Sequence, residues 1–310
     1  MEIFRCLAGS RLYGVSNENS DYDFKAVHLP TKRQILLGKR DQVISTSTGP
    51  KDARNSAGDT DTESFELQRF LKLASDMQTI PVEMLFVNGN DIWTPLWYEV
   101  VKNRDKILNR NAKAFVGYCK GQAVRYSMRG NRLETYEEVV KVLAAAPPSS
   151  VVGGRFTLLS AIEGVKIVTK DHNGKQVLYL DVFGRQVPEG VEAGEAVEVY
   201  RKPVREAGNR ARAAKESGGM DNKALYHAMR IVDEGIELFK TGNITFPCQN
   251  LDFLRQIRAG EVDLDRILDQ FDEKIAILEA IGDESPLAER PDKEWIDDFV
   301  ASVYEATVRG

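Results

Sequence analysis

The sequence predicts an α+β protein, with a small mixed sheet first, a β-rich insertion in the middle and a helical domain at the C-terminal end. Three observations support this order. Short apolar runs alternate with polar turns before residue 90, hairpin-like runs fill residues 155–201, and apolar residues recur at helical spacing from residue 222 onward. The mixed sheet is expected within residues 1–145, the β-rich insertion or linker within 146–220 and the helical domain within 221–310.

The N-terminal segment is expected to begin with short strands at 2–7, 23–29 and 33–45, joined by polar turns. Residues 45–60 contain almost nothing apolar and are expected to form a solvated loop of a length that is typical of functional loops. Residues 63–73 have near-helical spacing, although the first of them could still belong to a strand. These elements predict a small sheet with helices on it.

Further helical patterns follow at 96–108 and 112–128, and a stretch rich in Pro, Ser and Gly at 144–154 marks a domain boundary. The sequence pattern then changes in the middle of the chain. His-Asn-Gly and Pro-Glu-Gly turns separate apolar runs that favour strands, at 155–162, 165–171, 175–183 and 196–202.

Composition limits the classes of function. The formal net charge of −5 at pH 7 provides no global basic field, so any contact with nucleic acid must be local. Cys6, Cys119 and Cys248 are scattered, which fits neither a disulfide framework nor paired zinc ligands. We find no signal peptide and no apolar stretch of the ~18 residues that a membrane span needs. The sequence predicts a soluble, cytoplasmic protein without a membrane partner.

The segment from Gly9 to Asp23 carries the strongest chemical pattern. A strand end, a Gly9-Ser10 turn, a short helix and a second strand follow one another. A small residue lets backbone N–H groups approach phosphate oxygens, and the Ser10 hydroxyl adds a donor. Asp21 and Asp23 are two residues apart at a strand start, so both project from one face. Two carboxylates held so close favour a cation, and Mg²⁺ suits oxygen ligands beside phosphates.

A simpler interpretation exists for each part. Ser20-Asp21 could be an ordinary turn, and Asp-x-Asp occurs by chance in a chain with 47 acidic residues. The combination is more specific than its parts, because the Gly-Ser turn ends one predicted strand and the Asp pair begins the next. We therefore interpret the segment as one site.

This pattern, GSRLYGVSNENSDYDFKAV, resembles that of the DNA polymerase β nucleotidyltransferase superfamily, and within it the RNA-repair-associated polymerase β family that is common in phages and bacteria. Asp61 with Phe65-Glu66-Leu67 is similar to a later carboxylate-and-helix pattern of that family, with Gln68 replacing a basic position. Residues 81–85, 223–230 and 241–242 also resemble the family, whereas residues 150–205 do not.

The resemblance implies that residues 1–145 are a nucleotidyltransferase catalytic domain with a two-metal mechanism. Asp21, Asp23 and Asp61 would be both metal ligands and catalytic residues, holding two Mg²⁺ ions, with Mn²⁺ as an alternative. Glu63 would share a face with Asp61 on a strand, and Asp59 is near, so the third carboxylate is open between Asp61 and Glu63. The spacing to Phe65-Glu66-Leu67 favours Asp61.

Gly9 and Ser10 are the first candidates for nucleotide binding, and three residues of a later helix are secondary ones. Lys223, His227 and Arg230 fall at i, i+4 and i+7, so one helical face carries groups able to meet phosphate or base. A solvated face with a partly buried His227 explains them equally well. The basic segment 201–215 could likewise bind phosphates or form a solvated surface.

The expected reaction moves a nucleoside monophosphate from an NTP to a hydroxyl and releases pyrophosphate. An RNA 3′ end is the favoured acceptor, with a protein or a small molecule as alternatives. A catalytically silent nucleotide sensor or structural protein with the same fold is the contrasting hypothesis. The sequence does not specify the base preference or the oligomeric state.

Overall fold

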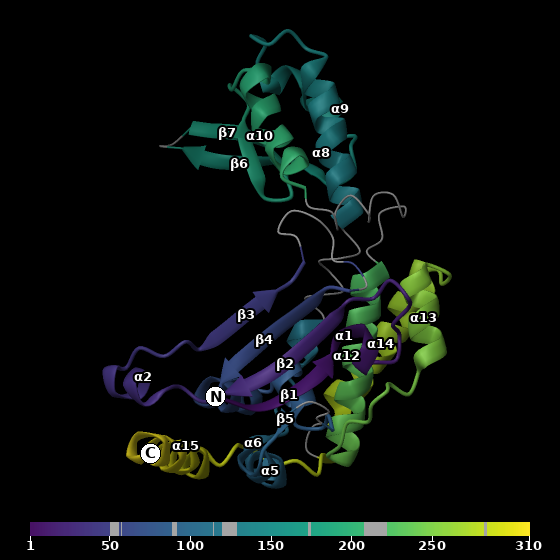
Figure 1. Ribbon diagram of the computed structural model, residues 1–310. Helices are drawn as coiled ribbons and strands as arrows, with labels where there is room; N and C mark the ends of the chain where they lie inside the picture. The colour runs from purple at the N-terminus through teal and green to yellow at the C-terminus, as the bar shows by residue number, and fades with distance from the viewer. Residues whose placement is uncertain are drawn as a thin grey trace. The chain divides into compact units, whose positions relative to one another are not determined.

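The computed structural model places the chain in two compact units, one formed by Met1–Lys120 with Tyr226–Gly310 and the other by Gly121–Leu225. The structure describes residues 1–49, 56, 58–88, 92–113, 115–119, 129–172, 175–207, 222–281 and 284–310 (Figure 1).

The first unit is built on a mixed sheet. Among the described residues, its strands are β1 (Glu2–Ala8), β2 (Tyr22–His28), β3 (Val43–Ser47), β4 (Thr60–Glu66) and β5 (Ile92–Trp93), in the order β3-β4-β2-β1-β5 (Figure 1). Strands β2 and β4 are parallel, and the other neighbours are antiparallel. The middle strand is therefore β2. The start of β2 lies between the end of β1 and the start of β4.

Helices cover this sheet and complete the unit. The described ones are α1 (Gly9–Leu12), α2 (Lys32–Leu37), α3 (Leu67–Ser75), α4 (Thr79–Met84), α5 (Pro95–Lys102), α6 (Arg104–Ile107), α12 (Asn222–Thr241, which starts in the second unit), α13 (Leu251–Ala259), α14 (Leu264–Ile281) and α15 (Lys293–Arg309). An aromatic stack fixes α3 and α5 on the sheet, because the Trp97 ring lies 4.0 Å from that of Phe4 and 5.2 Å from that of Phe70. All three side chains are fully buried, as expected for a core cluster.

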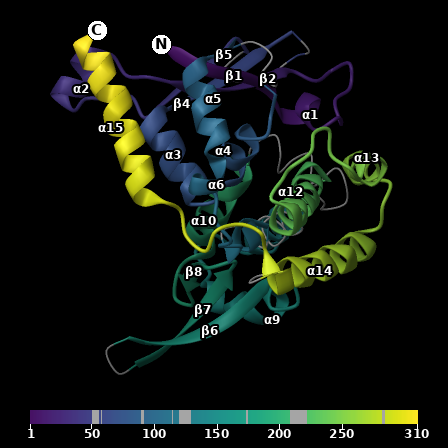
Figure 2. The same ribbon diagram turned by 90° about the horizontal axis from the view of Figure 1, so that it is seen from below.

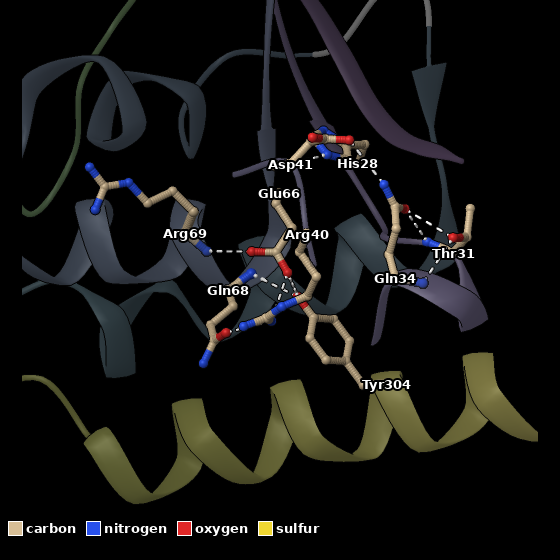
Figure 3. Close-up of polar contacts among 9 residues, drawn as sticks. All are labelled: His28, Thr31, Gln34, Arg40, Asp41, Glu66, Gln68, Arg69 and Tyr304. Carbon is tan, nitrogen blue, oxygen red and sulfur yellow. Dashed lines mark hydrogen bonds and ion pairs between the residues drawn. The ribbon is translucent and has the colours of Figure 1, made fainter. Parts of the chain in front are cut away.

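The last helix, α15, contacts α2, α3 and α6 (Figure 2). One buried carboxylate ties it to the sheet, because Glu66 at the end of β4 accepts hydrogen bonds from the Tyr304 hydroxyl of α15 and from Arg40 Nη1 at 3.0 Å (Figure 3). Glu66 also caps α3 by accepting a bond from the backbone N–H of Arg69. Burial raises the pKa of Tyr304, so its hydroxyl stays a donor.

Two expectations for the first unit need correction. Residues 33–45 were expected to form a strand, but Lys32–Leu37 is a helix and only Val43–Ser47 is strand. Thr31 and Gln34 form a capping box that begins this helix. The solvated loop expected at 45–60 is shorter for the same reason, since its first residues pair with β4. Residues 63–73 divide as the open alternative allowed, with strand to Glu66 and helix from Leu67.

The second unit contains an antiparallel sheet in the order β6-β7-β8, formed by β6 (Val165–His172), β7 (Lys175–Val182) and β8 (Arg185–Pro188). It also contains α8 (Arg129–Ala144), the 3-10 turn η1 (Val152–Arg155), α9 (Phe156–Leu159) and α10 (Ala193–Arg205). The hairpin expected at 165–183 is present. The strands expected at 155–162 and 196–202 are wrong, because Phe156–Leu159 and Ala193–Arg205 are helices.

The second of these errors has a clear cause. The β-branched residues of 196–202 favour a strand locally, but Ala193, Ala196, Val197 and Tyr200 are buried at helical spacing. The Tyr200 hydroxyl donates to the carbonyl of Leu180 at 2.8 Å and fixes α10 on the sheet. Packing in this unit therefore overrides local propensity.

The mixed α+β class is confirmed, with a mixed sheet near the N-terminus, a second sheet in the middle and helices at the C-terminal end. The boundaries at 145 and 220 stay predictions. Residues Tyr226–Gly310 group with Met1–Lys120 in one compact unit. None of the described helices combines the length and apolar character that crossing a membrane requires.

Candidate active site

The end of β1 and the starts of β2 and β4 lie side by side in the first sheet. Strand β1 ends at Ala8, which pairs with Asp23 on β2, and the parallel register of β2 and β4 pairs Asp23 with Asp61. Because these neighbours are set by the backbone ladder, the Gly9-Ser10 turn and both strand carboxylates come to the same place without any help from loops. Asp21 immediately precedes β2 and completes the group.

The three carboxylates form a group that could hold a metal ion. One carboxylate oxygen each from Asp21, Asp23 and Asp61 lie within 4.8 Å of one another, and all three residues are partly exposed. Among the described side chains, this is the one such cluster of acidic, His or Cys groups. A set of carboxylate oxygens at this spacing fits Mg²⁺ or Mn²⁺, and mutual repulsion of the three charges favours a bound cation.

The structure brings Asp61, rather than the other two candidates, into this cluster. Glu63 lies on the same face of β4 but forms an ion pair with Lys25, whose Nζ is 2.7 Å from Oε2. Asp59 is partly exposed and accepts hydrogen bonds from the backbone N–H and the hydroxyl of Ser56, which lower its pKa. The face therefore carries two adjacent cross-strand pairs, Asp23 with Asp61 and Lys25 with Glu63.

Gly9 packs directly against the carboxylate of Asp23. Its φ of +62° lies in the left-handed region, and a Cβ placed on it would fall 2.0 Å from Asp23 Oδ2. Any side chain would thus strain the backbone and displace the carboxylate. Ser10, in the first turn of α1, is partly exposed. The expected succession of strand, short helix and strand is confirmed, and Gly9 and Ser10 are the first two residues of that helix.

Arg11 is a residue at this site that sequence reasoning missed. Its Nη2 donates to the carbonyl of Ser20 at 2.7 Å, and its Nε donates to the carbonyl of Asp21 at 3.1 Å. The guanidinium also lies 3.8 Å from the centroid of the Tyr22 ring. Arg11 thus fixes the backbone that presents Asp21. The one signal in the sequence is its place directly after the Gly-Ser turn, which does not reveal the partner.

The three secondary candidates on α12 differ in burial and in surroundings. Lys223 is exposed and belongs to the second unit, so the structure does not place it against the carboxylates. His227 is half-buried beside the Tyr226 ring. Arg230 is 2% exposed, with Nη1 2.9 Å from Glu83 Oε1 and 2.6 Å from Glu234 Oε1, so its guanidinium lies in the core. The expectation that it binds nucleotide directly therefore gives way to a structural role.

The basic segment 201–215 is only partly described. Its first residues end α10, where Arg201 and Arg205 pair with Glu198 at the surface. Residues 208–215 lie outside the described residues. Surface ion pairs of this kind contribute little to stability.

The site thus combines a mixed sheet, three clustered carboxylates at adjacent strand ends and a glycine packed against one of them. Residues 2–146 match the model of the RNA repair pathway DNA polymerase beta family, the family that the sequence resembles. The family suggests nucleotidyltransferase activity. The match does not include the C-terminal helices.

A phage protein extends the likeness over the whole chain. The chain is 29% identical to an uncharacterized 38.9 kDa protein from the nrdC-mobD intergenic region of Enterobacteria phage T4, over 97% of this chain and 96% of that protein. The similarity to this relative therefore extends beyond residue 146. No solved structure matches the chain.

Proposed function

We propose that the protein is a metal-dependent nucleotidyltransferase, which moves a nucleoside monophosphate from an NTP to an acceptor hydroxyl. The observation that carries the proposal is the cluster of Asp21, Asp23 and Asp61 oxygens within 4.8 Å, with Gly9 packed against one of its members. The match of residues 2–146 to a polymerase β family supports the same chemistry.

Each residue has a role that follows from its place. The Gly9 and Ser10 amides and the Ser10 hydroxyl bind the phosphates of the nucleotide, since no side chain at Gly9 blocks the approach. Asp21 and Asp23 would hold the metal ion, and Asp61 orients the acceptor hydroxyl and takes its proton. When bound, Mg²⁺ would neutralise charge on the phosphates and lower the pKa of the acceptor hydroxyl.

In the proposed reaction, one bond to the α-phosphorus forms and one breaks. The acceptor oxygen bonds to the α-phosphorus as the bond from that phosphorus to the α,β-bridging oxygen breaks, and pyrophosphate leaves. The protein contributes mainly by positioning, because the reacting groups must lie close and in line. Lys223 and His227 remain proposed contacts to the nucleotide, whereas Arg230 does not.

We propose an RNA 3′ end as the acceptor, because the matching family is described as part of an RNA repair pathway. The net charge of −5 means that RNA contacts would be local and moderately salt-dependent. A hydroxyl of a protein or a small molecule is the alternative acceptor. A silent nucleotide sensor is disfavoured, since three clustered carboxylates without a cation would only destabilise the fold.

The proposal is tested by incubating the protein with Mg²⁺, each NTP labelled at the α-phosphate, and either short RNAs or a protein pool. We expect labelled RNA with wild type and a loss of about 10²-fold or more with Asp21→Asn or Asp23→Asn. Blocking the RNA 3′ hydroxyl should abolish the product. Labelled protein instead of RNA would change the acceptor, and unchanged labelling by the Asn variants would remove the site from the account.

A further inference from the structure

We infer that helices α12 and α13 position the nucleotide-binding turn, through Arg230, Arg255 and Arg258, which hold the segment directly after α1. The inference rests on the proposed function of Gly9 and Ser10. It assigns a task to helices that lie beyond the matched residues 2–146. These arginines are positioning residues, because they contact the segment from Tyr13 to Val15 rather than the reacting groups.

Helix α1, which begins with Gly9 and Ser10, has no buried side chain that would hold it in position. Helix α1 has four residues, and none of them is buried. So short a helix is far below the length at which helical hydrogen bonds alone stabilise the conformation. With no buried side chain of its own, α1 depends on the residues on either side for its position. Arg11 supplies one such restraint toward Asp21.

The segment that follows α1 is tied to the turn through the backbone. The N–H of Tyr13 donates to the carbonyl of Gly9 at 3.2 Å, and the N–H of Val15 donates to the carbonyl of Ser10 at 3.0 Å. A shift of this segment would therefore move the two residues proposed to bind phosphate. Its position is decided by what holds residues 13 to 15.

Two arginines of α13 hold the backbone of the segment. Arg255 Nη2 donates to the carbonyl of Gly14 at 2.7 Å, and Arg258 Nη1 donates to the carbonyl of Val15 at 2.6 Å. Charged donors make these bonds stronger than neutral ones. Gly14 also has a φ of +79°, and a Cβ there would fall 2.9 Å from Pro247, so the segment packs closely on the chain that leads into α13.

The side chain of Tyr13 provides the third anchor, in the core. Its hydroxyl donates to Glu83 Oε2 at 2.6 Å, and the Arg230 guanidinium lies 3.6 Å from the centre of its ring. Arg230 in turn bonds to both Glu83 and Glu234. Burial raises the pKa of Tyr13 well above its usual value, so the hydroxyl keeps its proton and donates. The core network of α4 and α12 thus ends on the residue that closes α1.

The test must separate positioning from general stability. Substituting Arg230 would leave the buried side chains of Glu83 and Glu234 without their hydrogen-bond donor and could unfold the protein. Arg255 and Arg258 bind from the surface or near it, so Arg255→Ala and Arg258→Ala should fold. Arg266→Ala is the matched control, because Arg266 is an exposed arginine of α14 whose guanidinium lies over Phe253 instead. Arg258→Lys retains a charged donor and serves as the rescue.

Two measurements on the full chain are needed. Hydrogen exchange of amides in residues 9–15 should be about tenfold faster in Arg258→Ala and Arg255→Ala, while exchange in β2 and β4 is unchanged. The KM for NTP in pyrophosphate release should rise by about threefold to tenfold, with a smaller change in kcat and partial rescue by Arg258→Lys. Arg266→Ala should match wild type in both.

The outcomes distinguish this inference from the proposed function. If exchange in residues 9–15 is the same in both alanine variants as in wild type, the arginines do not hold the segment and the inference is wrong. If exchange rises while KM stays at the wild-type value, the anchoring does not serve nucleotide binding and the inference is equally overturned. A wild-type protein that releases no pyrophosphate overturns the proposed function instead, and the exchange result still decides the anchoring. Tyr13→Phe, which removes only the hydroxyl, should show the same exchange change in a weaker form.

Discussion

The α-carbon of Gly9 rests against the carboxylate of Asp23, so closely that a Cβ on Gly9 would lie 2.0 Å from Oδ2. This contact joins the turn proposed to bind phosphate with a carboxylate proposed to bind metal. The backbone ladder sets it, because Ala8, the residue before Gly9, pairs with Asp23 across β1 and β2. A fixed distance between the two groups is what positioning of a nucleotide requires.

Gly9→Ala should lower the rate of pyrophosphate release by about 10²-fold, because a displacement of about 1 Å at a reacting centre has that effect. An alanine forced into the positive φ of Gly9 should also reduce the free energy of unfolding by roughly 1 kcal/mol. Gly38→Ala is a matched control, since Gly38 has a φ of +63° but no atom within 4 Å of the added Cβ. Denaturant unfolding and initial rates check both variants. Equal activity in the two would contradict the account.

Asp61→Asn should reduce turnover by about 10²-fold or more, because it removes a charge and a proton acceptor from the cluster. Glu63→Gln should have an effect within a few-fold, since Glu63 pairs with Lys25 and lies outside the cluster. Rates over a range of Mg²⁺ concentrations check this, with weaker apparent metal affinity expected for the first variant alone. The reverse order of effects would assign the third carboxylate to Glu63.

Arg11→Ala should lower kcat by about tenfold with little change in the unfolding midpoint, because Arg11 orients the backbone before Asp21 at a partly exposed position. Arg11→Lys keeps the charge but not the two-point contact, so it should recover only part of the rate. Arg33→Ala, an exposed arginine of α2, is the control for a lost surface charge. A rate for Arg11→Ala equal to that of the control would show that this contact has no functional role.

Glu234 should make stability depend on pH. Burial raises its pKa from the ordinary 4.5 to about 8, opposed by Arg230 and reinforced by Glu83. The folded protein then keeps a proton that the unfolded chain releases above 4.5. This contribution is full below pH 4.5 and is lost as pH rises to about 8, by at most about 1.4 kcal/mol per pH unit.

The variant that checks this is Glu234→Gln, which resembles the protonated acid and does not titrate. Unfolding free energies of wild type and variant should diverge in favour of the variant as pH rises from about 5 to 8 and then run parallel. Equal pH dependence in both would show that Glu234 is ionised throughout in the folded protein.

Local patterns predicted two strands of the site, β1 and β2, whereas the residues of β4 were left open between strand and helix. The alternation in β1 and β2 and the Gly9-Ser10 turn give the elements, and the spacing of Asp21 and Asp23 gives their common face. The spacing to Phe65 favoured Asp61, which the parallel register of β2 and β4 brings beside Asp23. That register itself depends on pairing between distant segments, so no local pattern contains it.

Long-range partners explain most of what the sequence could not reveal. Arg230 was expected to face nucleotide because its helical face was clear, but its partner Glu83 lies 147 residues away and makes the site a buried one. Arg11 has partners that are backbone carbonyls, which carry no sequence signal. The helix α2 is different, since Thr31 and Gln34 are a local capping box that could have been recognised.

The most direct test of the central claim compares one NTP labelled at the α-phosphate with the same NTP labelled at the γ-phosphate. Each is incubated with wild-type protein, Mg²⁺ and an RNA with a free 3′ hydroxyl, and Asp23→Asn is the matched control. The account predicts that the α-label joins the RNA, the γ-label leaves in pyrophosphate, and the variant or added chelator stops both. Transfer of the γ-label to the RNA, or equal transfer by Asp23→Asn, would contradict it.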